Sequence, residues 1–257
     1  PAEPLFRSAR LVTQDGLAHE VHVETLPGIA RSDLAQTLSG SVPFADVVGV
    51  ATEPVGLYSD GQAETTLTLG TKQGVVKRVK PGPHPQRDSW PVITLEQGDQ
   101  VVGASNSVET DFAVFITRAG QLLKFPVSAV RPQGLPAGGV AGIKLGKGDQ
   151  VLFFSSVTEN PDASVLTVSG NSGEIPGTVP GRGKISLLED FPAKGRATQG
   201  VRAHRFRADE DQLELAWSGP HRPVATTAGG VAAPLPEELG KRDGSGEQLS
   251  AVTAYVG

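Results

Sequence analysis

The sequence predicts an all-β, propeller-like fold of about five repeated sheets. Runs rich in Val, Thr and aromatic residues alternate with turns, and 32 Gly and 20 Pro residues are spread along the 257-residue chain. Such a composition favours short strands and turns over helices. Two sequence phrases also recur with a period of about 50 residues, which is typical of one propeller blade per repeat.

The first recurring phrase is an apolar strand, a Thr-x-x-Gly turn and a second strand. It occurs at Leu11–Gly16, Thr68–Gly74, Val114–Gly120 and Val224–Gly230, and with one extra residue at Val165–Gly173. The second phrase, Gly-Asp-Gln-Val, occurs at 98–101 and again at 148–151. Because two independent phrases share nearly one period, we interpret the chain as an array of repeats. The glycine that closes each turn is expected to supply a positive φ.

The best preserved repeat runs from Phe112 to Val151. We expect one strand at Ala113–Thr117, a turn, a second strand at Gln121–Phe125, a Gly/Pro-rich loop, and a third strand at Val140–Leu145. This order predicts a hairpin followed by a strand that returns to the same unit.

We expect residues 1–257 to form a single domain of five blades. The expected blade limits are about 1–64, 65–111, 112–163, 164–222 and 223–257. The last repeat is short, and its AVTAYVG end is expected to supply a closing strand, because ring closure removes exposed sheet edges. The sequence leaves open whether the ring closes or remains an open spiral.

Several classes of site and location are excluded by composition. The chain contains no Cys, which excludes disulfides and thiolate metal sites. Its five His residues show no metal-ligand spacing, and no phosphate-cradling P-loop is present, so we expect neither a metal nor a cofactor. No apolar run approaches the ~20 residues needed to span a bilayer, and no signal peptide is visible. The chain lacks Met, even at position 1, and we expect a cytoplasmic fragment of a longer protein.

Charge is distributed unevenly along the chain, although the net charge is only −5. Residues 1–70 carry 3 bases and 9 acids, and residues 208–257 carry 3 bases and 8 acids. The central residues 71–207 carry 17 bases and 11 acids, a net charge of +6. Because phosphate binding depends on the local field, a basic centre between acidic ends favours contact with a polyanion.

Basic residues near the turns and loops of the central repeats are the candidate phosphate contacts. Lys77, Arg78 and Lys80 follow a tight turn, and we expect their side chains to project from the edge of the blade. A charged strand edge that blocks aggregation is the alternative role. The predicted phosphate-binding residues are Lys72, Lys77, Arg78, Lys80, Arg118, Lys124, Arg131, Lys144, Lys147, Arg182, Lys184, Lys194, Arg196, Arg202, Arg205 and Arg207.

Two other functions stay open on the residues alone. A propeller can serve as a protein-interaction platform without any nucleic-acid partner. An all-β serine protease would require Ser172, His84 and Asp111 to act together. The protease is the weaker alternative, because Ser172 occupies the turn position of the fourth repeat.

Two stretches, Thr71–Lys80 and Thr117–Asp149, resemble the C-terminal domain of bacterial type IIA topoisomerase A subunits. Blades of that family read as strand, Thr-x-x-Gly, strand with Lys-Arg, Gly-rich loop, strand and Gly-Asp, and fainter matches extend the resemblance over most of the chain. The resemblance implies a β-pinwheel of about five four-stranded blades. It also implies a basic outer rim that binds and bends duplex DNA.

The resemblance further implies that this domain is not itself an enzyme. It would be an accessory domain of an ATP-dependent topoisomerase in the bacterial cytoplasm, at the nucleoid. Its partners would be duplex DNA, the ATPase B subunit, and the N-terminal breakage-reunion core that belongs to the same polypeptide.

The first repeat departs from the DNA gyrase pattern. Gyrase A domains carry there a Gln-Arg-Arg-Gly-Gly-Lys-Gly box that is needed to wrap DNA, whereas this chain reads GIARSDLAQTLSG at 28–40. KGRATQG at 194–200 and QGLPAGG at 133–139 are at best remnants of the box. The pattern is similar to that of topoisomerase IV A subunits and predicts that the domain presents a DNA segment for strand passage. Gyrase-type wrapping is the alternative.

Overall fold

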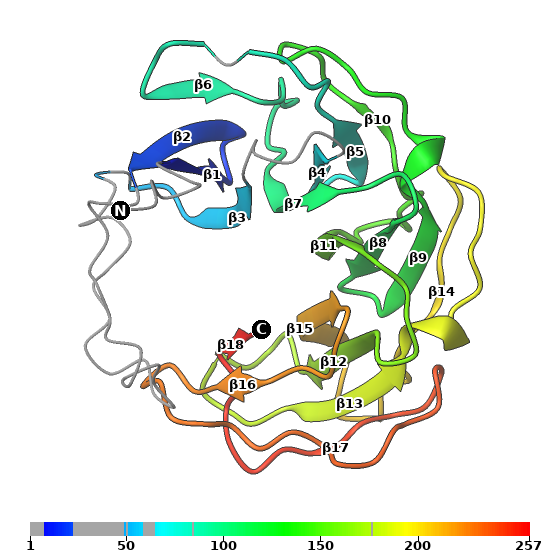
Figure 1. Ribbon diagram of the computed structural model, residues 1–257. Helices are drawn as coiled ribbons and strands as arrows, with labels where there is room; N and C mark the ends of the chain where they lie inside the picture. Colours follow the sequence, from blue (N-terminus) through cyan, green and yellow to red (C-terminus); the bar gives the residue numbers. More distant parts are fainter. Residues whose placement is uncertain (1–7, 23–48, 50, 59–64, 84, 176) are drawn as a thin grey trace.

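The computed structural model describes residues 8–22, 49, 51–58, 65–83, 85–175 and 177–257. In these residues the chain forms antiparallel sheets arranged around a common centre (Figure 1). Two short 3-10 helices, η3 at Val127–Ala129 and η4 at Leu188–Asp190, occur in the described part, and no α-helix does. No described helix has the length and apolar character that a membrane crossing would require.

Four sheets have four strands each, and every sheet begins with a hairpin of two long strands. The first sheet, in the order β3-β1-β2-β6, contains β1 Ser8–Thr13, β2 Leu17–His22, β3 Pro54–Tyr58 and β6 Ser89–Pro91. The second, in the order β10-β5-β4-β7, contains β4 Thr66–Thr71, β5 Val75–Arg78, β7 Val101–Ser107 and β10 Val140–Ala141.

The third and fourth sheets repeat the arrangement. The third, in the order β11-β8-β9-β14, contains β8 Phe112–Thr117, β9 Gln121–Pro126, β11 Val151–Val157 and β14 Val201–Arg202. The fourth, in the order β15-β12-β13-β17, contains β12 Ser164–Gly170, β13 Arg182–Leu187, β15 Gln212–Gly219 and β17 Glu247–Gln248. The fifth sheet pairs β16 Ala225–Thr226 with β18 Tyr255–Val256.

The outer strand of each four-stranded sheet comes from the following repeat. β10 belongs by sequence to the third repeat, yet it pairs with β5 of the second, with Val140 opposite Val76. β14 pairs with β9 in the same way, and β17 pairs with β13. The prediction of a strand returning to its own hairpin is therefore wrong. The returning segment crosses to the preceding blade, so neighbouring blades are joined by exchanged strands.

The recurring turn forms for a local reason. In the first three repeats the amide of the turn glycine donates to the threonine carbonyl three residues earlier, at 2.9 to 3.0 Å. Gly16, Gly74, Gly120 and Gly230 all have φ between 73° and 88°, as predicted from the pattern. Gly173 is the exception, because the fourth repeat replaces the two-residue turn by a longer loop between β12 and β13.

The Gly-Asp-Gln phrase fastens this turn. Asp149 Oδ1 accepts hydrogen bonds from the amides of Ala119 and Gln150, at 3.0 and 2.8 Å. Asp99 does the same for Gln73 and Gln100, at 2.9 and 2.8 Å. A single carboxylate thus satisfies two amides at the turn end of the blade, which explains why this phrase shares the period of the turn.

The core lies largely between the blades. One buried cluster joins Val76 of the second sheet to Phe115 and Phe154 of the third. The rings of Phe115 and Phe154 lie 4.7 Å apart between centroids. Trp90 is 2% exposed, and Trp217 packs partly buried against another cluster.

The prediction of about five four-stranded blades holds for four of them. The fifth sheet is two-stranded among the described residues. The AVTAYVG end supplies β18, which pairs within that sheet, with Val256 opposite Ala225. The departing segment 28–40 lies outside the described residues.

Candidate nucleic-acid interface

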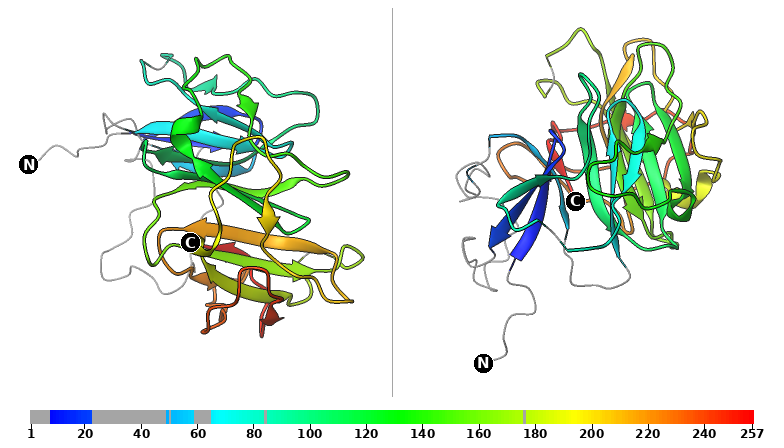
Figure 2. Two further views of the ribbon diagram at one scale, coloured as in Figure 1. Left: turned by 90° about the vertical axis from the view of Figure 1, so that its right-hand side faces the viewer. Right: turned by 90° about the horizontal axis from the view of Figure 1, so that it is seen from above.

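Segments that carry the exchanged strands cross the outer rim of the molecule, and we call them straps. Strap two comprises residues 85–98, strap three 127–146, strap four 188–210 and strap five 234–249. Figure 1 shows their strands β6, β10, β14 and β17 on the outside of the ring, opposite the inner strands β3, β7, β11 and β15. The left view of Figure 2 looks onto this rim, with the yellow strand of strap four lying across it.

Successive straps touch one another at equivalent positions. The amide of Thr94 in strap two donates to Ala137 O in strap three, at 3.4 Å. The amide of Lys144 in strap three donates to Thr198 O in strap four, at 3.0 Å. The amide of Arg205 in strap four donates to Gly244 O in strap five, also at 3.0 Å. The straps therefore form one continuous ridge along the rim, which we call the strap ridge.

Half of the predicted phosphate contacts carry exposed side chains, and most of these lie on the strap ridge. Lys144 and Arg205 stand at two of the three touching positions just described, on neighbouring straps. Arg196 is half-buried, and its guanidinium donates to Ala141 O, which ties strap four to strap three. The predicted residues on the ridge are Arg131, Lys144, Lys194, Arg196, Arg202, Arg205 and Arg207, with Lys80 exposed at the start of the crossing to strap three.

Sequence reasoning missed three further cations on the straps. Arg87 lies on strap two, and Lys241 and Arg242 lie on strap five, where Lys241 is exposed. Lys241 and Arg242 were missed because the fifth repeat is short and acidic overall. Comparing equivalent positions of the straps indicates these three cations, but that comparison requires knowledge of the strand exchange, which the sequence does not provide.

Four predicted residues are buried, and the expectation that Lys77 and Arg78 project from the blade edge is wrong. Lys77, Arg78, Lys124 and Lys184 are 0 to 4% exposed. They were placed at the surface because strand alternation alone does not show that the next strap covers that face. Of the three cations expected to project after the turn, Lys80, which follows the end of β5, is exposed.

Buried Arg78 and Lys124 occupy equivalent places in successive blades. Arg78 donates to Val130 O and pairs with Glu109, at 3.1 and 2.6 Å. Lys124 donates to Leu188 O and pairs with Glu159, at 3.0 and 2.7 Å. The Arg78 guanidinium lowers the pKa of the Glu109 carboxyl, by hydrogen bonding and then by its charge. Both cations thus bind the start of the following strap and a carboxylate.

The remaining predicted cations gather at the turn ends of the blades. Lys72 and Arg118 lie within Thr-x-x-Gly turns, and Lys147 precedes the Asp149 that fastens the second of these turns. Arg182 is paired with Asp209 and Glu210, at 3.1 and 3.2 Å. The sixteen predicted residues therefore divide into a rim group, a buried group and a turn-end group.

The alternative protease residues are not brought together in the described part of the chain. Ser172 Oγ donates to Asp211, whereas Asp111 accepts hydrogen bonds from Val108 N and Thr158 Oγ1. His84 lies outside the described residues. No group of three or more metal-ligating side chains occurs in the part of the chain that the structure describes.

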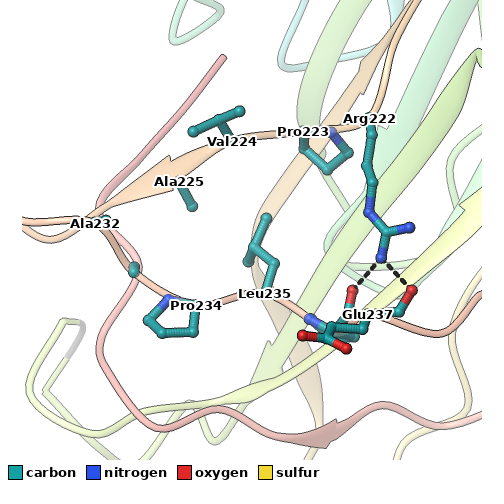
Figure 3. Close-up of a pocket in the computed structure, with 10 residues that line it drawn as sticks. Arg222, Pro223, Val224, Ala225, Ala232, Pro234, Leu235 and Glu237 are labelled. Atoms are coloured by element: carbon teal, nitrogen blue, oxygen red, sulfur yellow. Dashed lines mark hydrogen bonds between the residues drawn. The ribbon is translucent and has the colours of Figure 1, made fainter. Parts of the chain in front are cut away.

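One apolar pocket lies beside the fifth sheet (Figure 3). Val224 and Leu235 line it, and Arg222 and Glu237 stand at one end. The Arg222 guanidinium donates to the carbonyls of Pro236 and Glu237. This arginine is used to hold the local backbone, and we do not count it among the ridge cations.

Comparison with known proteins agrees with this architecture. The family model described as DNA gyrase C-terminal domain, beta-propeller, matches residues 111–158 and 181–214. The DNA gyrase A protein of Salmonella typhimurium is 29% identical over 189 residues, which cover 72% of this chain and 20% of that protein. The DNA gyrase A protein of Chlamydia pneumoniae is 36% identical over 141 residues, covering 53% of this chain and 16% of the relative. The chain thus spans a fifth or less of these relatives.

Solved structures show the same fold. The C-terminal domain of DNA topoisomerase IV matches with a TM-score of 0.73 and 20% identity, over 97% of this chain and 78% of that one. The DNA gyrase A C-terminal domain matches with a TM-score of 0.69 and 17% identity, over 99% of this chain and 83% of that one. Since both subtypes match, the comparison does not separate them. In sequence and in fold, the chain resembles the C-terminal, propeller-type domains of type IIA topoisomerase A subunits.

Proposed function

We propose that this domain binds duplex DNA along the strap ridge. The observation that carries the proposal is the placement of cations where neighbouring straps touch. Lys144 of strap three and Arg205 of strap four occupy equivalent positions, each hydrogen-bonded through its backbone to the following strap. Further cations on straps four and five extend the row of positive charge along the rim.

The chemistry of this row suits the phosphate backbone rather than base edges. Its side chains lie on an outward-facing rim, and flexible cations of this kind position a duplex without reading its sequence. Each neutralised phosphate contributes about 0.9 to the slope of log affinity against log salt, so five contacts would give a slope of about −4.5. A curved row along several blades would bend the bound segment.

Within the whole enzyme, the domain would act as an accessory, non-catalytic part. It would hold a DNA segment and present it to the N-terminal breakage-reunion core of the same polypeptide. The ATPase B subunit would be a further partner. The proposed setting is the bacterial cytoplasm, at the nucleoid. Because the first repeat lacks the gyrase box, the proposed subtype is topoisomerase IV-like.

A pair of charge reversals, one on strap three and one just beyond its end, tests the proposal. We expect Lys144→Glu to weaken duplex binding about tenfold and to reduce the salt slope by about 1, because it removes a phosphate contact. Lys147→Glu makes the same charge change three residues away, at the turn end, and is expected to change affinity no more than about twofold. Fluorescence anisotropy with a labelled duplex at several salt concentrations measures both.

Two results would contradict the proposed interface. Equal losses in the two variants would show that the net charge, and not the ridge, governs binding. A salt-independent affinity would exclude phosphate contacts. Ligation of relaxed circular plasmid on the domain addresses the subtype: strong induced writhe would favour gyrase-type wrapping over the topoisomerase IV-like proposal.

A further inference from the structure

Two buried lysines that do not reach the surface join the straps together. Lys77 is 0% exposed and Lys184 is 4% exposed. Each lies on the second strand of its hairpin, with Lys77 opposite Leu69 and Lys184 opposite Thr167. Leu69 and Thr167 each stand one residue before the last residue that precedes the register shift with the inner strand, at Gly70/Thr71 and at Val168/Ser169. The two lysines opposite them are therefore structurally equivalent.

Each ammonium group binds three backbone carbonyls that belong to two successive straps. Lys77 Nζ donates to Val92 O of strap two at 2.7 Å, and to Leu135 O and Ala137 O of strap three at 2.7 and 2.8 Å. An ammonium group has three N–H donors, and these contacts use all of them. Among the described residues, every hydrogen-bond partner of this group is a carbonyl.

The second lysine repeats this arrangement one strap pair further along. Lys184 Nζ donates to Ala203 O of strap four at 2.6 Å, and to Lys241 O and Arg242 O of strap five at 3.0 and 2.5 Å. Ala203 and Val92 are equivalent, because the amide of each donates to the turn glycine of the preceding blade. The same junction is therefore built twice.

The junction between straps three and four is built without a lysine. Leu123 occupies the equivalent position in β9, opposite Phe115. There the carbonyl of Gly142 accepts the amide of Ala197 directly, at 2.7 Å. Ala197 has φ of 61°, which is an unfavourable conformation for alanine. Where no lysine is present, a direct backbone hydrogen bond connects straps three and four, and Ala197 adopts a strained conformation to make it.

We propose that Lys77 and Lys184 are positioning residues of the DNA interface: each ammonium group locks two successive straps and so fixes the spacing of the cations they carry. Lys77 would hold Arg131 and Lys144 of strap three relative to strap two. Lys184 would hold Lys241 and Arg242 relative to Arg205. This inference rests on the proposed function for its DNA consequence, but not for the locking itself.

Both buried lysines have a lowered pKa. Burial lowers the pKa of Lys77 to about 8. Burial lowers the pKa of Lys184 to about 8 as well, with the Arg242 charge adding to the effect and Asp243 opposing it. His204 of strap four also faces Lys184.

These lowered pKa values determine how the opening of a strap depends on pH. A lysine released to water by strap opening has a higher pKa than one that is locked, so opening takes up a proton between pH 8 and about 10.5. Raising the pH through this range therefore favours the locked strap, in which the buried lysine is then a neutral amine with two N–H donors and no charge to desolvate. The part of strap four that joins strap three, residues 195–202, has no such junction lysine, because Leu123 stands at that position.

Hydrogen exchange of the free domain, read by mass spectrometry, tests the locking. Lys77→Met should speed exchange of the amides in 133–142 by at least about tenfold, because two strap carbonyls lose their donor and the strap opens more often. Leu123→Met is the matched control, since it places the same side chain at the equivalent position, and residues 195–202 of strap four should keep their protection. Equal effects in both variants, or none in either, would overturn the proposal.

Wild-type protein supplies an independent test should Lys77→Met fail to fold. After correction for intrinsic exchange, protection of 133–142 relative to 195–202 should rise above pH 8 by up to about tenfold per pH unit. A flat ratio between about pH 7 and 9.5 would overturn the proposal.

DNA binding then tests the positioning role. Lys77→Met should weaken duplex binding about threefold to tenfold although it removes no surface charge, since preorganisation contributes affinity without new contacts. A loosened strap with unchanged DNA affinity would refute the positioning role. If the wild-type domain does not bind DNA, the proposed function fails, and the exchange experiment still decides whether the lysines lock the straps.

Discussion

The spacing between blades two and three depends on a glycine, and replacing it gives a sharp prediction. Gly103 lies in β7, the inner strand of the second sheet, against the backbone of Phe154 in β11. A Cβ added there would lie 2.0 Å from Phe154 O. The neighbouring serines Ser105 and Ser156 are hydrogen-bonded across the same two strands, at 2.6 Å. Gly103→Ala would force these strands apart.

The loss of stability in Gly103→Ala can be estimated from the contact with the Phe154 backbone. A Cβ approaches other atoms no closer than 3.0 Å, so the strands must separate by roughly 1 Å. The obstacle is backbone held in a ladder with β8 and cannot rotate away. Overpacking typically costs about 1–3 kcal/mol, and a rigid obstacle puts Gly103→Ala near the upper end, at about 3 kcal/mol.

Urea unfolding followed by circular dichroism measures this loss. Gly146→Ala is the matched control, because nothing lies within 4 Å of its added Cβ and its φ is not in the left-handed region. We expect the control to stay within about 0.5 kcal/mol of wild type. A Gly103→Ala protein that is destabilised by less than about 1 kcal/mol would refute the argument that backbone contact between inner strands sets the blade spacing.

Two further predictions concern the turns and the acid limb of stability. Asp149→Ala should destabilise the domain by about 1–3 kcal/mol in urea unfolding, since the Ala119 and Gln150 amides lose their acceptor; an unchanged midpoint would show that water replaces the carboxylate. Burial, with a contribution from Lys184, lowers the pKa of His204 from 6.5 to about 4. Between these pH values the unfolded chain binds a proton that the folded domain does not, so stability should fall as the pH falls, by up to about 1.4 kcal/mol per unit. His204→Asn should flatten this slope in the same unfolding measurement, and an identical slope in both proteins would contradict the assignment.

Repeated local chemistry made much of the fold predictable. A Thr-x-x-Gly turn needs only a carbonyl and a glycine at positive φ within four residues, so its period could be read directly from the sequence. The two long strands of each hairpin followed from the flanking apolar runs. The turn of the fourth repeat could not be predicted in this way, since a longer loop at 171–181 replaces the short turn.

Partners of the outer strands could not be predicted in this way. Val140 and Val76 are 64 residues apart in the chain, yet they pair across two repeats. Local patterns specify that a strand exists and leave its partner open, because a two-residue strand carries too little side-chain information to select one. The hairpin turns were local and could be predicted, whereas the strap crossings were not.

The sequence alone determined an array of β-repeats with its positive charge in the central repeats, because turn chemistry and composition are local properties. Only the tertiary structure decided which cations face water. Lys77 meets carbonyls of residues 58 and 60 positions away, on a strap supplied by the next repeat. Strand alternation placed Lys77 on a face of its blade, and the covering of that face by a distant segment buried it. Lys144, with the same charge, remains exposed because no other described segment covers the strap on which it lies.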